Sequence, residues 1–135
     1  IELSGIRGRM VDMEIDIEPA EGELFNRFAV RFAKDAEHHT GFSFRPRESV
    51  VKVDRKFSGS RRAIIHQRRA KVDHDRGRLK LRLILDRFSV EAFIGEGEQV
   101  MFATLYTDLT ARGISFYADG RARFRVRAWS LERGE

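Results

Sequence analysis

The sequence predicts an all-β protein, a two-sheet antiparallel β-sandwich of the jelly-roll or concanavalin-like kind with about ten short strands. Hydrophobic and polar residues alternate with a period of two along much of the chain, as in strands with one buried and one solvated face. Turn-forming residues recur roughly every eight to twelve residues, the spacing of sandwiches and barrels. Because several strands are apolar on one face only, two sheets packed face to face would bury them as one core.

The expected strands follow one another along the whole chain. In the first, Val11, Met13, Ile15 and Ile17 alternate with Asp12, Glu14, Asp16 and Glu18. In the second, Phe28, Val30 and Phe32 face inward, with Arg27 and Arg31 outward. The full set of expected strands covers residues 11–18, 27–32, 41–45, 49–54, 62–66, 79–85, 90–94, 100–106, 114–118 and 122–131.

Three connections carry specific turn signals. Residues 86–89 form a tight connection between two expected strands, and Gly95-Glu96-Gly97 closes a hairpin. Asp119-Gly120 is a strong short-range hairpin signal, so we expect the last two strands to pair with each other.

Composition bounds the organisation of the chain. It has 135 residues, of which 41% are hydrophobic and 35% charged, and no cysteine. We expect residues 1–135 to form one domain. Disulfides, thiol nucleophiles and cysteine-ligated zinc are excluded. No uncharged stretch approaches the roughly twenty residues that span a bilayer, so no membrane partner is expected. No targeting segment is visible, and the location, cytoplasmic or secreted, is that of the parent protein.

Two segments carry a more specific pattern. Residues 81–94 followed by Gly97-Glu98 resemble the segment Leu-Arg-Ile-x-Val-Asp-Arg-Ser-Ser-Val-Glu-Val-Phe-x-x-x-Gly-Glu in the C-terminal β-sandwich of glycoside hydrolase family 32, the β-fructosidases. Residues 51–59 resemble the Asp-Arg-x-x-Ser-Gly segment of that domain, and residues 113–118 and 128–131 resemble its final strands. Phe88 stands where the family usually has a small hydroxyl residue. The resemblance implies a structural or interdomain role for Asp54, Arg55, Ser58, Gly59, Asp86, Arg87, Ser89, Glu91 and Phe93.

The resemblance also implies where the chemistry lies. The catalytic carboxylates of the family belong to an N-terminal five-bladed propeller, in motifs of the Asn-Asp-Pro-Asn-Gly, Arg-Asp-Pro and Glu-Cys type, and this sequence contains none of them. It implies a non-catalytic C-terminal domain with no catalytic, cofactor or metal residues, whose partner is the propeller of the same polypeptide. The parent would hydrolyse sucrose, sucrose phosphate or fructans with retention. Contact with fructan or sucrose, and a homodimer, are further expectations.

The carboxylates of the first expected strand have two interpretations. A retaining glycosidase needs two carboxyl groups about 5 to 5.5 Å apart, and Asp12, Glu14 and Asp16 share one strand face. A solvated face is the better interpretation, because nothing apolar lies between them to favour a protonated acid. Arg121, Arg123, Arg125 and Arg127 give the last strand a basic face. We therefore expect the first and last strands to be antiparallel neighbours with opposite charges facing each other.

Other functions have weaker signals. His38-His39 and Asp73-His74-Asp75 contain metal-ligand types, but sequence neighbours on an extended chain point to opposite faces, so solvated loops are expected. Residues 41–84 hold fourteen Lys or Arg against four Asp or Glu. Without a nucleic-acid-binding signature, the arginine-rich stretch 61–71 is interpreted as a solvated face or one that docks on an acidic domain. The alternative function is a stand-alone carbohydrate-binding module, for which the candidates Trp129, Tyr106 and Tyr117 are equally good core residues.

Overall fold

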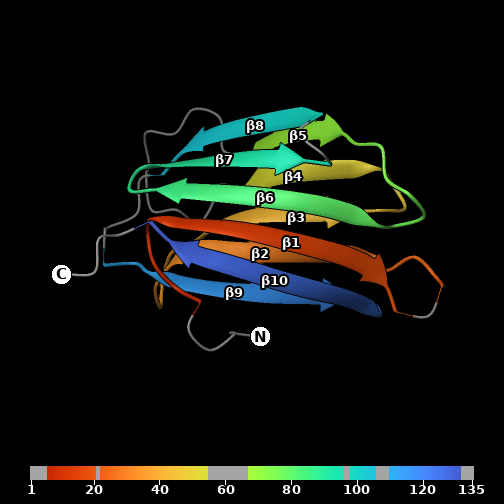
Figure 1. Cartoon of the computed structure of the whole chain (residues 1–135), viewed down its shortest axis with the longest axis horizontal. Coiled ribbons are helices and arrows are strands. Elements are labelled where there is room, and N and C mark those ends of the chain that lie inside the picture. The colour runs from red at the N-terminus through yellow and green to blue at the C-terminus, as the bar shows by residue number, and fades with distance from the viewer. Residues whose placement is uncertain (1–5, 21, 55–66, 96–97, 106–109, 132–135) are drawn as a thin grey trace.

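The chain folds into two antiparallel sheets packed face to face. The computed structural model describes residues 6–20, 22–54, 67–95, 98–105 and 110–131, which form ten strands and no helix. Sheet A has the order β10-β1-β6-β7-β8 and lies nearest the viewer in Figure 1, while sheet B has the order β5-β4-β3-β2-β9 and lies behind it. The strands are β1 Val11–Pro19, β2 Arg27–Lys34, β3 Thr40–Arg45, β4 Val50–Asp54, β5 Gln67–Lys71, β6 Leu79–Asp86, β7 Ser89–Ile94, β8 Gln99–Thr104, β9 Gly113–Asp119 and β10 Ala122–Ser130. The predicted all-β sandwich is confirmed.

The core lies between the two sheets and differs in composition on its two sides. Sheet B supplies phenylalanines that are fully buried, among them Phe28, Phe32, Phe42, Phe44 and Phe116. Sheet A supplies aliphatic side chains and Met13, including Ile15, Ile17, Leu81, Leu83 and Leu85. Removal of this apolar surface from water is the main stabilising contribution to the fold, and the inward positions are those that the period of two predicts.

The predicted pairing of the first and last strands is confirmed. β1 and β10 are antiparallel neighbours, and their register places Glu14 opposite Arg127 and Asp16 opposite Arg125. β1 also pairs with β6 on its other side. The four carboxylates of β1 therefore lie between two strands that carry cations.

The expected hairpin at Asp119-Gly120 is wrong. β9 pairs with β2 in sheet B, whereas β10 pairs with β1 in sheet A, so this turn crosses from one sheet to the other. Gly120 has φ +99°, and a Cβ there would lie 3.0 Å from the Cα of Phe25. The amide of Asn26 donates to the carbonyl of Asp119 at 2.8 Å. The Asp-Gly pair thus satisfies the backbone of a tight crossing turn, which needs a positive φ as much as a hairpin does.

Two other expectations concern the connections. The expected pairing across residues 95–97 is confirmed, because β7 and β8 pair antiparallel from Ser89–Thr104 to Ile94–Gln99, while residues 96 and 97 lie outside the described residues. The expected strand at 62–66 lies outside the described residues, and the structure places strand β5 at Gln67–Lys71, within the arginine-rich stretch. The described part of the chain contains no helix long and apolar enough to cross a membrane.

Candidate functional site

The outer face of sheet A carries a charge ladder centred on β1. The guanidinium of Arg82 donates to both carboxylate oxygens of Asp12, from Nε at 2.9 Å and from Nη2 at 2.6 Å. Arg127 donates to Glu14 at 2.7 Å, and Arg78 Nε lies 4.0 Å from Glu18. We define the charge ladder by its members Asp12, Glu14, Asp16, Glu18, Arg78, Lys80, Arg82, Arg123, Arg125 and Arg127.

The charge ladder is not arranged as a catalytic pair. A glycosidase acid needs apolar surroundings that favour its protonated form. The carboxylates of β1 instead face guanidinium groups on a half-exposed surface. The expected pairing of opposite charges is seen for Glu14, which pairs with Arg127 of β10, and for Asp12, which pairs with Arg82 of β6 and not with β10.

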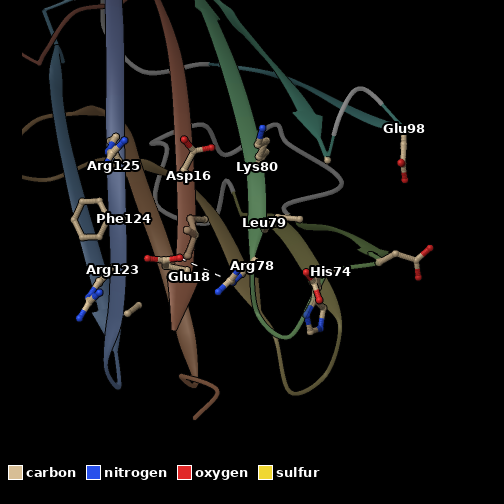
Figure 2. A pocket seen from close by; sticks show the side chains of 15 residues that line it. Asp16, Glu18, His74, Arg78, Leu79, Lys80, Glu98, Arg123, Phe124 and Arg125 are labelled. Atoms are coloured by element: carbon tan, nitrogen blue, oxygen red, sulfur yellow. Dashed lines mark ion pairs between the residues drawn. The ribbon is translucent and has the colours of Figure 1, made fainter. Parts of the chain in front are cut away.

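A wide groove of about 1240 Å³ lies at the end of sheet A where β1 ends and β6 and β10 begin. In Figure 2, Asp16 lies between Arg125 and Lys80, and Glu18 faces Arg78. Phe124 and Leu79 contribute apolar surface. Both signs of charge line this groove, as expected for a polar surface.

His74, on the turn beside the groove, has a structural role. Its Nδ1 accepts the amide of Gly77 at 2.8 Å, so Nε2 carries the proton and donates to the carbonyl of Pro46 at 2.9 Å. Ser49 Oγ lies 3.1 Å from the same Nε2. Both ring nitrogens are thus occupied, while Asp73 and Asp75 are exposed as expected. Among the described residues, no three His, Cys, Asp or Glu side chains are grouped to hold a metal ion.

Five of the family-motif positions come together on the β6–β7 hairpin, namely Asp86, Arg87, Ser89, Glu91 and Phe93. Asp86 Oδ1 accepts a hydrogen bond from the amide of Arg87 at 2.7 Å. In a typical Asx turn the donor is the amide two residues further on. Asp54 lies on the other sheet, with its carboxylate 3.5 Å from Lys52 Nζ. Arg55, Ser58 and Gly59 lie outside the described residues, as does most of the arginine-rich stretch.

An apolar patch lies on the outer face of sheet A beside that hairpin. The register aligns Ile84 with Glu91 and Phe102, and Phe93 with Val100. Val100 is 55% exposed, Phe102 48%, and Phe88 of the β6–β7 turn 56%. We define the apolar patch as Ile84, Phe93, Val100 and Phe102 of this face together with Phe88 of the adjoining turn; the exposed Glu91 lies between Ile84 and Phe102. Patches of this kind on a soluble domain mark contact surfaces.

The only tryptophan of the chain, Trp129, belongs to the same face. It lies opposite Asp12 on β10 and is 49% exposed. The register continues from Asp12 to Ile84, so Trp129 lies in one row across the sheet with Ile84 and Phe102 of the apolar patch. Of the aromatic candidates for sugar binding, Trp129 is therefore a surface residue and not a core residue, and Tyr106 lies outside the described residues.

The outer face of sheet B holds a second polar group that the sequence does not reveal. Lys34 Nζ donates to Ser115 Oγ at 3.0 Å and to the hydroxyl of Tyr117 at 3.1 Å, and Ser115 donates to Tyr117 at 3.1 Å. The guanidinium of Arg31 lies 4.3 Å from the centre of the Tyr117 ring, a cation–π contact. We name this group the Lys34–Ser115–Tyr117 cluster.

A β-bulge makes the Lys34–Ser115–Tyr117 cluster. The pairing of β2 with β9 shifts register between Arg31 and Lys34, and Ala33 has φ 48°. In an unbroken strand Lys34 would point to the core side with Phe32, and the bulge turns it outward. The sequence places Arg31 outside correctly but carries no sign of the bulge.

Two pKa values respond to this arrangement. Hydrogen bonds from Ser115 and Lys34 lower the pKa of Tyr117 below its usual value, because they stabilise the phenolate. Burial, aided by the charges of Arg31 and Lys34, lowers the pKa of His39. This part of sheet B is electropositive.

Comparison with known proteins places the chain in a sequence family. Residues 1–130 match the family model described as "Glycosyl hydrolases family 32 C terminal". The chain is 28% identical to a levanase of Bacillus sp. (strain L7) over 123 residues, which cover 87% of this chain and 13% of the levanase. It is 32% identical to a sucrose-6-phosphate hydrolase of Staphylococcus xylosus over 114 residues, 84% of this chain and 22% of that protein.

Solved structures share the fold. An exo-inulinase from Aspergillus awamori superposes with a TM-score of 0.83 at 19% identity, over 94% of this chain and 26% of the inulinase. A sucrose-6-phosphate hydrolase from Lactobacillus gasseri gives a TM-score of 0.78 at 18% identity, over 97% of this chain and 26% of that structure. The chain thus spans about a quarter or less of each of these proteins.

Proposed function

The chain belongs to the family of glycosyl hydrolase family 32 C-terminal domains, and from that premise we propose that it is the non-catalytic domain of a longer fructoside hydrolase. A catalytic domain elsewhere in the polypeptide would cleave β-fructosidic bonds, and the β-sandwich would support it. Sucrose, sucrose phosphate and fructans are the proposed substrates of the whole protein.

One observation carries this proposal. The family match runs over residues 1–130, yet the chain spans only 13% of the levanase and 22% of the sucrose-6-phosphate hydrolase. The chemistry of the described residues agrees with a supporting role, because Asp12 and Glu14 of the charge ladder are paired with arginines. A hydrolase that works through two carboxyl groups needs them desolvated and differently protonated.

A direct contact with sugar is the second candidate function, and the exposure of Trp129 favours it. Aromatic rings stack on the apolar faces of sugars, and Asp12 beside Trp129 supplies hydrogen-bond acceptors. This contact would extend the substrate surface of the whole protein to fructan. We further propose that the protein associates with a second copy of itself as a homodimer.

The test compares this chain with the polypeptide encoded by its complete coding sequence. Each is assayed for release of fructose from sucrose, levan and inulin, and for retention by immobilised levan. We expect hydrolysis by the complete polypeptide and none by the chain alone. Cleavage by the chain alone, or no cleavage of any fructoside by the complete polypeptide, would refute the supporting role. Equal retention of the chain and its Trp129→Ala variant would refute the sugar contact.

A further inference from the structure

We propose that the apolar patch on the outer face of sheet A is the surface on which the catalytic domain of the same polypeptide packs. This inference rests on the proposed function and adds to it the surface through which the two domains touch.

The apolar patch combines two features that favour protein cover over solvent. Val100 and Phe102 are about half exposed, and they belong to β8, which pairs with β7 on one side and forms the edge of sheet A. An exposed apolar edge strand is a site of aggregation unless another part of the protein covers it. In the rest of this face, the charge ladder already supplies a hydrated surface.

Phe88 is exposed and yet held in place. The carbonyl of Arg87 accepts a hydrogen bond from Arg9, whose side chain is 2% exposed. The carbonyl of Phe88 itself accepts the amide of Leu105 at 2.7 Å. The turn that carries this ring is therefore fixed by two distant segments of the chain. A rigid exposed aromatic side chain is a good contact residue, since little conformational entropy is lost when it is buried.

The path of the backbone brings the segment before β1 to the β6–β7 turn, at one end of sheet A. Residues 8–10 lead into β1, where Gly8 donates to the carbonyl of Arg112 at 2.8 Å and Met10 accepts the amide of Leu131 at 2.9 Å. Arg9 then joins this segment to the β6–β7 turn. In Figure 1, β1 begins at the end of sheet A where β6 ends and β7 begins. A domain that precedes this segment in the polypeptide would therefore enter at the end of the sandwich that carries the β6–β7 turn, and would have to extend across β6 and β7 to reach Val100 and Phe102 on β8.

The occupant follows from the proposed function and from the greater length of the matched relatives. The matched relatives are four to eight times longer than the segment they share with it, as the coverages of 26%, 22% and 13% imply. Interfaces between domains of one chain commonly bury about 600–1,500 Å². A half-exposed cluster of aromatic and aliphatic side chains on a flat sheet is the surface of this domain that fits such a partner.

The experiment uses the polypeptide encoded by the complete coding sequence. The double variant Val100→Lys/Phe102→Lys places two charges on the patch at outward positions, and Asp16→Asn/Glu18→Gln is the control, because it changes the net charge equally on the charge ladder. Calorimetry measures whether the two domains unfold in one transition. Limited proteolysis measures how fast the connection between them is cleaved.

We expect the wild type and the control to unfold in one transition. In the patch variant the transition separates into two, the midpoint of the catalytic domain falls by about 3 °C or more, and cleavage between the domains accelerates. Unchanged unfolding of the patch variant would overturn the inference. Two other results in the patch variant, with domain coupling intact, would also overturn it. Conversion of a dimer to a monomer in sedimentation would mean that a second copy of the protein covers the patch. Loss of levan retention would mean that the polysaccharide covers it. Calorimetry does not depend on hydrolysis, so failure to cleave fructosides would refute the proposed function alone.

Discussion

The two outer faces of the sandwich neutralise their charge in different ways. On sheet A, arginines meet carboxylates across strands, as in the bidentate contact between Arg82 and Asp12. On sheet B, Lys34 is held by the hydroxyls of Ser115 and Tyr117, and Arg31 lies over an aromatic ring. Hydroxyls and rings orient a cation without cancelling its charge, and the charges of Arg31 and Lys34 add to burial in lowering the pKa of His39.

This difference bears on which face a second domain covers. Burial of charged groups is costly unless they are paired and hydrogen-bonded, and sheet B would bring Arg31, Lys34 and His39 to an interface. Sheet A offers an apolar patch next to the ion pair of Arg82 with Asp12, with the exposed Glu91 between Ile84 and Phe102.

The largest effect is expected at Ser115, which is 1% exposed although it belongs to the outer side of sheet B. The variant Ser115→Ala removes one acceptor from Lys34 and one donor to Tyr117. We expect the free energy of unfolding in urea to fall by about 1–2 kcal/mol. Ser43→Ala, at a half-buried position on the same face, is the control and should change stability by less than about 0.5 kcal/mol. Similar losses in both variants would show that the Lys34–Ser115–Tyr117 cluster does not stabilise the fold.

A smaller effect is expected in the charge ladder, where two ion pairs of different geometry can be compared. Double-mutant cycles with Asp12→Asn and Arg82→Gln should give a coupling energy of about 1 kcal/mol, because that contact is bidentate and Asp12 is well shielded. The single contact of Glu14 with Arg127, treated in the same way, should give about 0.3 kcal/mol. Both couplings should decrease at high salt. Equal couplings would mean that geometry does not distinguish the two pairs.

The fold could be predicted because its information is local and periodic. Inward positions such as Met13 and Leu83 follow from alternation alone, and the opposite charges of β1 and β10 predict their pairing. The Asp119-Gly120 signal failed because it specifies a backbone conformation and not the strand that the chain meets afterwards.

The functional surfaces could be predicted less well. The motif residues of the β6–β7 hairpin were found through resemblance, but their grouping with Val100 and Phe102 depends on the register of β7 and β8. Lys34 could not be placed on the outer face because a bulge at Ala33, which no residue type announces, reverses its direction.

A third prediction concerns the phenol of Tyr117. The hydrogen bonds from Ser115 and Lys34 lower its pKa, so Lys34→Met should raise that pKa toward the ordinary value for tyrosine. Absorbance at alkaline pH follows the phenolate, in a Tyr106→Phe background that leaves Tyr117 as the sole tyrosine. Arg31→Met, which removes a more weakly acting charge, is the control and should raise the pKa less. An equal response to both substitutions would mean that the charge of the face, and not hydrogen bonding, determines the titration.

The smallest effect is expected for His39, and its sign follows from proton linkage. Burial and the cations Arg31 and Lys34 lower its pKa, against a weaker opposing influence of Asp54. Between the lowered value and the ordinary value of about 6.5, the unfolded chain binds more protons at this residue than the folded chain does. The free energy of unfolding should therefore decrease as the pH falls through about 6.5, and the decrease should end below the folded pKa. His39→Gln should flatten this part of the stability profile, whereas His38→Gln, which leaves His39 in place, should retain it. The same pH dependence in the wild type and in His39→Gln would show that folding does not lower the pKa of His39.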